Sequence, residues 1–306
     1  LGGKYILILI NGHKLSGDIS NNADLNRINM ARVKRIEVLD GAASSLYGSD
    51  AIAGVINIIT DQPTGNLVSA TSTSRVSGKG QFTEQVNVDI YSHGFGSYTS
   101  FSHDRADSYR ISPLEYVKGE DDKTQQSLSP LFTGYRNNLV SQRFTWQTTK
   151  QLAFNAGMEY GFKKTDRPNT NPDITGGLDY EMRYKSLRWN VGGIYKWNSR
   201  NSIQTDFTVD RYRYGKEYDV ETKTYKVGDY VQSKKQRTMD GEVKAILGLT
   251  PNSTTIFGVD WRNDMLVATS GNIDNNVYTL SGYGQHEMAL PLHLKATVGA
   301  RYTYHK

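Results

Sequence analysis

Cysteine is absent from the sequence. Its absence excludes disulfide scaffolds, zinc–thiolate sites, iron–sulfur clusters and cysteine nucleophiles. Long apolar runs are missing too: the longest extends from Tyr5 to Ile10, whereas a membrane-spanning helix needs roughly 20 mostly apolar residues. Helical membrane proteins are therefore excluded. The first residues contain no charged region leading into an apolar core, so they do not form a signal peptide.

A concentrated charge of one sign is also missing. The 306 residues include 36 basic and 31 acidic side chains, which gives a net charge of +5. The basic residues are scattered along the chain, whereas a nucleic-acid-binding surface gathers them in one patch or stripe. We therefore expect no nucleic-acid partner.

Glycine and tyrosine are abundant, with 29 and 20 residues against only 7 prolines. After residue 63, apolar and polar residues alternate over long stretches, most clearly from Leu152 to Lys163 and from Leu292 to His305. Period-two alternation predicts strands with one apolar and one polar face. The expected strands are 66–76, 82–92, 95–106, 137–149, 151–165, 180–198, 201–217, 232–249, 252–269, 276–289 and 292–306. They are much longer than ordinary globular strands, which have a mode of about five or six residues.

Short turns and long polar links alternate between these strands. The longer links are residues 107–136, 166–179, 218–231 and 270–275. This alternation is typical of transmembrane β-barrels, in which the turns face the periplasm and the loops face outside. We therefore predict a mainly β fold, a transmembrane antiparallel β-barrel with a lipid-facing side and a wet lumen. A soluble β-sandwich is the alternative.

Two further expectations follow from the barrel interpretation. Aromatic residues near strand ends should form the interfacial girdles: Trp146, Trp189, Trp197, Tyr283, Tyr302 and Tyr304. Bacterial single-chain barrels have even strand numbers, and an open edge in lipid leaves backbone groups unpaired. Eleven strands therefore indicate a piece of a larger barrel, or one that a partner completes.

Residues 32–60 have a different character, because small residues and glycines separate two short apolar runs. They predict a strand from Arg35 to Leu39, a turn, a helical turn from Ala42 to Tyr47 and a buried strand from Val55 to Thr60. The segment resembles the plug domain of TonB-dependent outer-membrane receptors, whose plugs carry runs of the form RIEVLKGPASALYGSxAIGGVINIITK. Upstream, Leu7 to Leu15 resembles the VLIDGVRL strand and turn of the same family.

The resemblance implies that residues 1–62 are the C-terminal part of an α+β plug domain. Residues 63–306 would then be the N-terminal half of the barrel, about 11 of the 22 strands that the family has. The implied function is TonB-dependent import of a scarce nutrient across the Gram-negative outer membrane, with the plug on the periplasmic side and the long loops extracellular. The cargo we expect is a ferric siderophore, with haem or cobalamin as alternatives. A passive porin or adhesion barrel is the rival from another class.

The implied partners are the TonB–ExbB–ExbD energising complex, outer-membrane lipid and a surface-exposed lipoprotein. The sequence shows no TonB box, the N-terminal motif through which TonB acts. No intrinsic cofactor is expected, since the ligand itself would be an iron chelate or haem. Enzyme motifs fail on inspection: His286 and Glu287 begin like HExxH, but Leu290 stands where the second histidine is needed. We therefore expect no enzymatic activity.

The candidate ligand-binding residues lie after the first plug strand and in the predicted outer loops. They are His13, Tyr109, Arg110, Tyr116, Tyr135, Arg136 and Arg167. Arg and Tyr suit anionic, aromatic ferric siderophores, and an imidazole can bind haem iron. A solvated turn histidine and ordinary hydrated loops are the alternative interpretations.

Two plug residues are expected at the contact between plug and barrel. Arg35 and Glu37 lie on one face of the predicted strand, and we expect them to form ion pairs with lumen residues such as Glu159 or Asp210. Such pairs would bear on gating, because buried charge pairs are costly to break.

Overall fold

The structure is a computed structural model. It describes residues 6–15, 18–19, 22–23, 25–39, 46–47, 54–61, 67–109, 116–118, 124–126, 132–167, 180–219, 221, 223–291 and 294–306. Two sheets dominate this part of the chain: a small one built by residues before 61 and a large one that begins at residue 67. No helix among the described residues is long and apolar enough to cross a membrane.

The small sheet has the order β2-β1-β6-β5. Its strands are β1 (Leu7–Ile10), β2 (His13–Lys14), β5 (Val33–Leu39) and β6 (Val55–Thr60). Leu7, Leu9 and Val55 form its buried core, with Tyr47 packed against them. The strands predicted at Arg35–Leu39 and Val55–Thr60 are present, whereas most of the helical turn predicted from Ala42 lies outside the described residues.

Short elements connect the strands of this N-terminal segment (residues 6–61). They are β3 (Asp18–Ile19), β4 (Asn22–Ala23) and two 3-10 turns, η2 (Leu25–Arg27) and η3 (Met30–Arg32). The two 3-10 turns lie directly before β5, and they carry several of the polar side chains that reach the large sheet.

The large sheet contains eleven strands in the order β19-β18-β17-β16-β15-β14-β13-β12-β9-β8-β7. Their bounds are β7 (Leu67–Val76), β8 (Phe82–Ser92), β9 (Phe95–Ala106), β12 (Tyr135–Gln147), β13 (Leu152–Arg167), β14 (Tyr180–Lys196), β15 (Ser202–Tyr218), β16 (Tyr230–Thr250), β17 (Ser253–Ala268), β18 (Ile273–Ala289) and β19 (Lys295–His305). All neighbours are antiparallel. The eleven predicted strands are confirmed. The link from β9 to β12 contains a hairpin that was not predicted, β10 (Tyr116–Lys118) with β11 (Thr124–Gln126).

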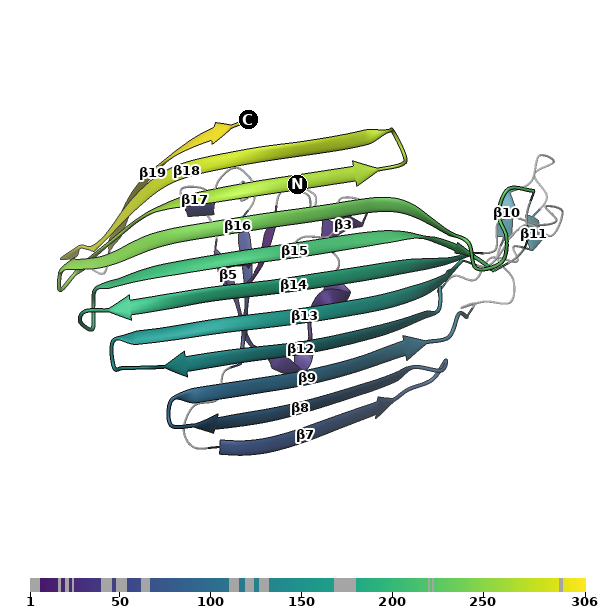
Figure 1. The fold of residues 1–306 in the computed structure, drawn as a ribbon, viewed down its shortest axis with the longest axis horizontal. Helices are drawn as coiled ribbons and strands as arrows, with labels where there is room; N and C mark the ends of the chain where they lie inside the picture. Colours follow the sequence, from purple (N-terminus) through teal and green to yellow (C-terminus); the bar gives the residue numbers. More distant parts are fainter. Residues whose placement is uncertain are drawn as a thin grey trace.

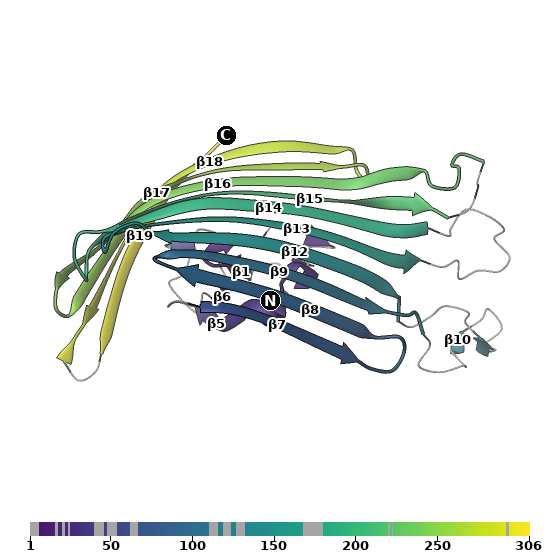
Figure 2. The same cartoon turned by 60° about the horizontal axis from the view of Figure 1, so that its bottom comes forward.

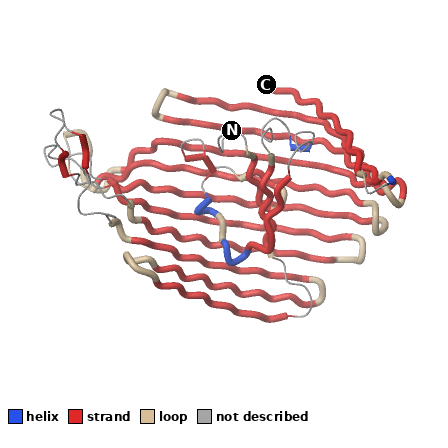
Figure 3. Tube along the Cα trace, turned by 180° about the vertical axis from the view of Figure 1, so that it is seen from behind, coloured by secondary structure: helices blue, strands red, loops and turns tan. Residues whose placement is uncertain are grey.

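The large sheet curves around the N-terminal segment. Figure 1 looks onto its outer face, and the view from behind in Figure 3 shows the segment lying across the opposite, inner face. Figure 2 shows the curvature, with the segment beneath the concave side. The strand ends that the longer links join lie at one end of the sheet, and the short turns lie at the other (Figure 1).

The two faces of the large sheet differ in chemistry as the alternation predicts. On β15, Asp206 and Asp210 lie on the inner face, where both meet the N-terminal segment. Phe207 lies on the outer face, where its ring packs at a tilt against Trp189 of β14. Exposed apolar side chains continue on the outer face across the neighbouring strands, as at Val140, Met158, Val191 and Val243. This is the arrangement of a barrel wall with one apolar and one polar side.

One of the residues predicted for the aromatic girdles, Tyr283, lies on the inner face of the sheet and not on the outer face. Tyr283 is only 7% exposed, and its hydroxyl donates a hydrogen bond to Glu242 on the inner face at 2.5 Å. Because side chains alternate along a strand, a shift of one position reverses the face. Leu280, at an even position of the same strand, is 55% exposed on the outer side. The prediction for Tyr283 is therefore corrected.

Candidate functional site

The strongest contact between the N-terminal segment and the large sheet is an ion pair. Arg27 Nη2 donates to Asp210 Oδ1 at 2.7 Å, and the two side chains are 4% and 1% exposed. The guanidinium also lies over the ring of Tyr212, 5.5 Å from its centroid. Burial by itself lowers the pKa of Arg27, but Asp210, Glu159 and Tyr212 together outweigh burial, so that this pKa is raised above its ordinary value. Arg27 thus stays charged where it is buried.

A second arginine of the segment contacts the same inner face near another edge of the large sheet, at β8. Arg32 reaches Asp89 of β8 with both terminal nitrogens, at 2.9 Å and 2.6 Å. Its Nη2 also donates to the backbone carbonyl of Thr99 at 2.8 Å. The 2.9 Å contact is a hydrogen bond from Nη1 to Oδ2, and the 2.6 Å contact of Nη2 with Oδ1 is an ion pair. Arg27 and Arg32 therefore attach the segment to β15 and to β8.

Two arginines of the large sheet also donate hydrogen bonds to the N-terminal segment. Arg143 donates to Thr60 Oγ1 and to the carbonyl of Asp61, both at 2.5 Å. Arg188 donates to the carbonyls of Ile10 and His13 at 3.3 Å and 3.4 Å. Backbone carbonyls near the ends of β1 and β6 thus accept hydrogen bonds from the wall, as buried backbone oxygens require.

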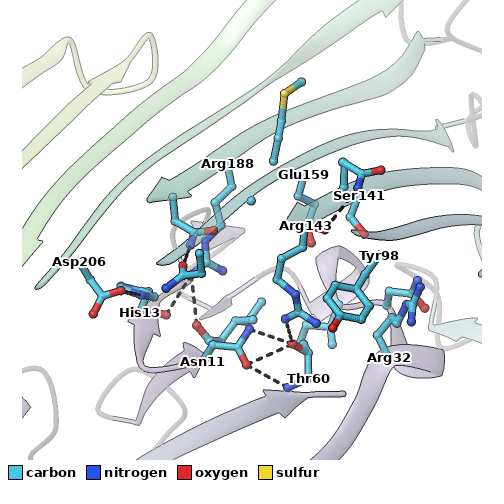
Figure 4. A pocket seen from close by; sticks show the side chains of 18 residues that line it. Asn11, His13, Arg32, Thr60, Tyr98, Ser141, Arg143, Glu159, Arg188 and Asp206 are labelled. Atoms are coloured by element: carbon cyan, nitrogen blue, oxygen red, sulfur yellow. Dashed lines mark hydrogen bonds and ion pairs between the residues drawn. The ribbon is translucent and has the colours of Figure 1, made fainter. Parts of the chain in front are cut away.

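A cavity of about 280 Å³ separates the segment from the sheet between these contacts. Figure 4 shows Arg143, Glu159, Arg188 and Asp206 lining it from the sheet, with Asn11, His13, Arg32 and Thr60 facing them. Glu159 Oε1 is buried and has no hydrogen-bond partner among the described residues. A polar cavity of this size can hold ordered water that would satisfy such a group.

His13 lies at this cavity and not at the outer end of the strands. Its Nε2 is 3.7 Å from Asp206 Oδ1, and its side chain is 15% exposed. The cavity is smaller than the about 300–1,000 Å³ that small-molecule pockets usually span. Among the described residues, no group of three or more His, Cys, Asp or Glu side chains could hold a metal ion.

The predicted outer-loop residues are only partly brought together. Tyr109 stacks on Phe132 at 4.9 Å, and Tyr135 lies 6.3 Å from the same ring. Lys79 lies over the ring of Tyr109 at 5.4 Å. Arg136 is separate from this group, because it points to the outer face and pairs with Glu181 at 3.4 Å. Arg110 lies outside the described residues, and the side chains of Tyr116 and Arg167 are not described.

The inner face between Arg27 and the long links carries a ladder of aromatic rings, here called the tyrosine ladder. Its members are Tyr180, Tyr184, Tyr212, Tyr214 and Tyr218. Tyr184 lies 6.5 Å from Tyr212 and 5.4 Å from Tyr214.

Two lysines accompany the tyrosine ladder. Lys163 lies over the ring of Tyr184 at 5.1 Å, and Lys216 lies over the ring of Tyr180 at 4.7 Å. The ladder starts at Tyr212 beside Arg27 and ends at Tyr218 beside Tyr225, whose ring is stacked at 4.3 Å. Ring contacts join Tyr184, Tyr212 and Tyr214 into one group nearer the segment and Tyr180 with Tyr218 into another nearer the long links. Tyr184, Tyr212 and Tyr218 are buried.

The predicted partners of Arg35 and Glu37 are wrong. Arg35 Nη2 lies 2.7 Å from Glu37 Oε1, and the two side chains are 55% and 35% exposed. Asn57 of the neighbouring strand also donates to Glu37, at 3.1 Å. The reason is the strand period: residues two apart share a face of β5, an edge strand of the small sheet. Asp210, one of the expected partners, is engaged by Arg27 instead.

Sequence reasoning missed the arginines that attach the segment. Arg27 and Arg32 lie in irregular chain before β5, where no periodicity marks a face. The sequence of the large sheet contained a clearer indication of the contact. Arg188 and Asp210 are charged residues at polar-face positions of long strands, and they face one another in register. Opposite charges at paired lumen positions could have indicated the contact.

Comparisons with known proteins agree with this architecture. Residues 1–55 match the family of the TonB-dependent Receptor Plug Domain. The chain is 24% identical over 362 residues to the vitamin B12 transporter BtuB of Photobacterium profundum, covering 93% of this chain and 57% of that protein.

Solved structures share the fold at low identity. The siderophore receptor PirA from Acinetobacter baumannii has a TM-score of 0.75 at 16% identity, covering 100% of this chain and 49% of that one. The ferric enterobactin receptor PfeA from Pseudomonas aeruginosa has a TM-score of 0.73 at 18% identity, covering 100% and 50%. The chain thus spans about half the length of the proteins it matches. Its first 55 residues match the plug domain of the TonB-dependent receptors, and the eleven strands that follow share the fold of the barrels in these solved structures.

Proposed function

We propose that this chain is part of an outer-membrane receptor that imports a ferric siderophore with energy from TonB. One observation carries the proposal: a plug-family segment lies on the polar inner face of a barrel wall and is attached there by buried ion pairs. A passive pore has no use for such an attachment. A receptor needs one, because its lumen must stay closed until ligand binds. The family consists of transporters and receptors, which agrees with a chain that is not an enzyme.

The tyrosine ladder supports an aromatic, anionic cargo. Phenol rings stack on other aromatic rings, and lysines add charge-assisted hydrogen bonds to anionic oxygens. Ferric chelates built from catechol or phenol groups present both features. Solved relatives include the ferric enterobactin receptor PfeA in complex with enterobactin and the ferric yersiniabactin receptor FyuA of Yersinia pestis. These names are consistent with the cargo that the ladder favours.

Cobalamin is the second candidate, because the curated relative is a vitamin B12 transporter. Haem has less support, since His13 lies at a cavity of about 280 Å³ between the plug and the wall. The remaining parts of the proposal are the energising complex TonB–ExbB–ExbD, a surface-exposed lipoprotein partner, outer-membrane lipid around the apolar face, and extracellular long loops.

The test uses the whole receptor in its own membrane. Its abundance is measured in iron-starved, cobalamin-starved and replete cells, and the purified receptor is titrated with a ferric catecholate, a ferric hydroxamate, haemin and cyanocobalamin. Induction by iron starvation and selective binding of the catecholate would support the proposal. Induction by cobalamin starvation with binding of cyanocobalamin alone would replace the cargo. If small solutes diffused freely through the protein in the absence of any ligand, the protein would be a passive pore and the proposed receptor function would be wrong.

A further inference from the structure

The outer face of the large sheet carries a cluster of like charges. Its members, here called the cationic cluster, are Lys185 of β14, Arg211 and Arg213 of β15, and Lys235 and Arg237 of β16. The register places Lys185 directly opposite Arg213, and Arg213 directly opposite Lys235. In the adjacent row Arg211 is opposite Arg237. Three neighbouring strands therefore present cations side by side.

This arrangement is unfavourable unless an anion lies over it. Directly opposed side chains have Cβ atoms about 4.5–5.5 Å apart, and like charges there are destabilising. None of the five cations forms a salt bridge with an acidic side chain in the part of the chain that the structure describes. The contacts that they do make are with neutral groups: Lys185 lies over the ring of Phe162 at 5.7 Å, and Arg237 donates to Asn263 at 2.9 Å.

Charges nearer the long links are arranged differently. Arg183 pairs with Glu217, and Lys164 pairs with Glu181. Both acidic residues therefore have partners of their own. At the next outer-face position toward the long links, the cations are therefore paired with acidic side chains, whereas those of the cationic cluster are not. The cluster is a local feature of the sheet and not part of a general excess of basic residues.

The position of the cluster along the strands, relative to the apolar band of the wall, indicates which kind of group could bind it. On β14 the outer-face residues Leu187, Trp189 and Val191 are apolar, and Lys185 follows two positions further toward the long links. The same change occurs on β15 between Val209 and Arg211. A lipid-facing apolar band of a barrel is about 25 Å tall, so side chains directly beyond its edge lie at the depth of lipid headgroups.

We infer that the cationic cluster binds the phosphate groups of a phosphorylated lipid headgroup in the outer leaflet. Arg and Lys are the side chains that recognise phosphate, Arg through its fork and Lys as a point charge. Clusters of them at the membrane surface attract anionic headgroups. The charge complementarity explains why cations are tolerated in three adjacent strands. The inference depends on the proposed outer-membrane location, and it goes beyond import because the site is on the opposite face of the wall from the tyrosine ladder.

The test measures lipid retained by the purified whole receptor with native mass spectrometry. The probes are bisphosphorylated lipid A, its dephosphorylated form and inorganic phosphate. The triple variant Lys185→Gln/Arg213→Gln/Lys235→Gln should bind bisphosphorylated lipid A at least tenfold more weakly than the native receptor. The dephosphorylated lipid should bind both proteins equally. The matched control Lys150→Gln/Lys196→Gln/Lys223→Gln removes the same charge at exposed positions elsewhere and should bind as the native receptor does.

Each outcome separates the lipid site from import. Equal retention by the native receptor and the triple variant would overturn the inference, as would binding of inorganic phosphate with the same affinity as the lipid. Binding of the ferric chelate is measured on the same samples. If the native receptor retains the lipid but binds no ferric chelate, the proposed cargo fails and the lipid site stands.

Discussion

Arg27 and Asp210 are separated by 183 positions in the chain, yet they form a 2.7 Å ion pair that is almost completely buried. One belongs to the plug and the other to the barrel wall. The two groups that attach the plug cannot be separated without exposing a charge to solvent or leaving a buried charge without its partner.

Replacing Asp210 by Asn should loosen the plug strongly. Removing one partner of a buried ion pair costs about 3–5 kcal/mol, because the other charge is left uncompensated. Hydrogen exchange of the β1 and β6 amides in the whole receptor should therefore accelerate, while exchange of the β13 amides should change little. The double variant Arg27→Leu/Asp210→Leu should recover part of the loss. Faster exchange in the double variant than in the single variant would contradict a role for the uncompensated charge.

The exposed pair of the same segment serves as the comparison. Lys34 Nζ is 3.9 Å from Asp61 Oδ1, with side chains 56% and 47% exposed. Surface pairs contribute about 0–1 kcal/mol, so Lys34→Ala should leave amide exchange in β1 and β6 nearly unchanged. A large effect here would mean that exchange reports overall stability of the segment and not the buried pair.

Shortening the tyrosine ladder should weaken binding of an aromatic ferric chelate. Tyr184 contacts two ring neighbours and lies beneath Lys163. Aromatic pairs contribute about 0.5–1.5 kcal/mol beyond area burial, so Tyr184→Leu should raise the Kd of a ferric catecholate about tenfold. Tyr195→Leu changes an outer-face tyrosine that is 45% exposed and should leave the Kd as it is. Titration of tryptophan fluorescence in the purified whole receptor gives both values. Equal Kd values would remove the ladder from the binding site.

Two adjacent residues of β14 test which face meets lipid. Val191 is 46% exposed on the outer face, whereas Asn190 lines the inner cavity. An arginine at mid-membrane on the lipid face costs about 2–4 kcal/mol, so Val191→Arg should lower the free energy of unfolding of the whole receptor in lipid by that amount. Asn190→Arg can extend toward Glu159 and Asp206 and should cost much less. If Asn190→Arg proved the more damaging of the two, the assignment of the faces would be reversed.

The turn from β8 to β9 depends on glycine at one position. Gly94 has φ +83°, and a Cβ there would lie 2.7 Å from the carbonyl oxygen of Gln147. A left-handed conformation costs a non-glycine residue about 1–2 kcal/mol, and the close approach to the backbone adds to this cost. Gly94→Ala should therefore lower the unfolding free energy of the whole receptor by more than about 1 kcal/mol.

Gly78 provides the matched control for this turn, because nothing lies within 4 Å of a Cβ built there. Gly78→Ala should leave stability within experimental error. Equal destabilisation by both substitutions, measured by urea-induced unfolding in the same lipid, would argue against strain at Gly94.

The long strands were predictable because each one carries its own signal. The alternation from Leu152 onward indicates both a strand and its two faces, and β13 begins at that residue. The plug motif at Arg35 to Leu39 and Val55 to Thr60 was equally local, and both strands are present. Tyr283 was misplaced because its prediction used position near a strand end and ignored its parity, which puts it on the inner face.

The attachment of the plug was not predictable in the same way. Arg35 was chosen because it belongs to the recognisable motif, yet its partner is Glu37, two residues away. Arg27 and Arg32 lie in chain without periodicity, and their partners Asp210 and Asp89 are reached only because the N-terminal segment lies against β15 and β8.

The sequence by itself determined the strands, their apolar and polar faces and the family of the plug, because these depend on short-range spacing along the chain. Only the tertiary structure decided which plug arginine meets which wall carboxylate, how the tyrosines of β14 and β15 align into a ladder, and that three strands set their cations side by side on the outer face. Those relationships depend on strand register and on how the plug is seated, which are fixed by the simultaneous burial of groups far apart in sequence.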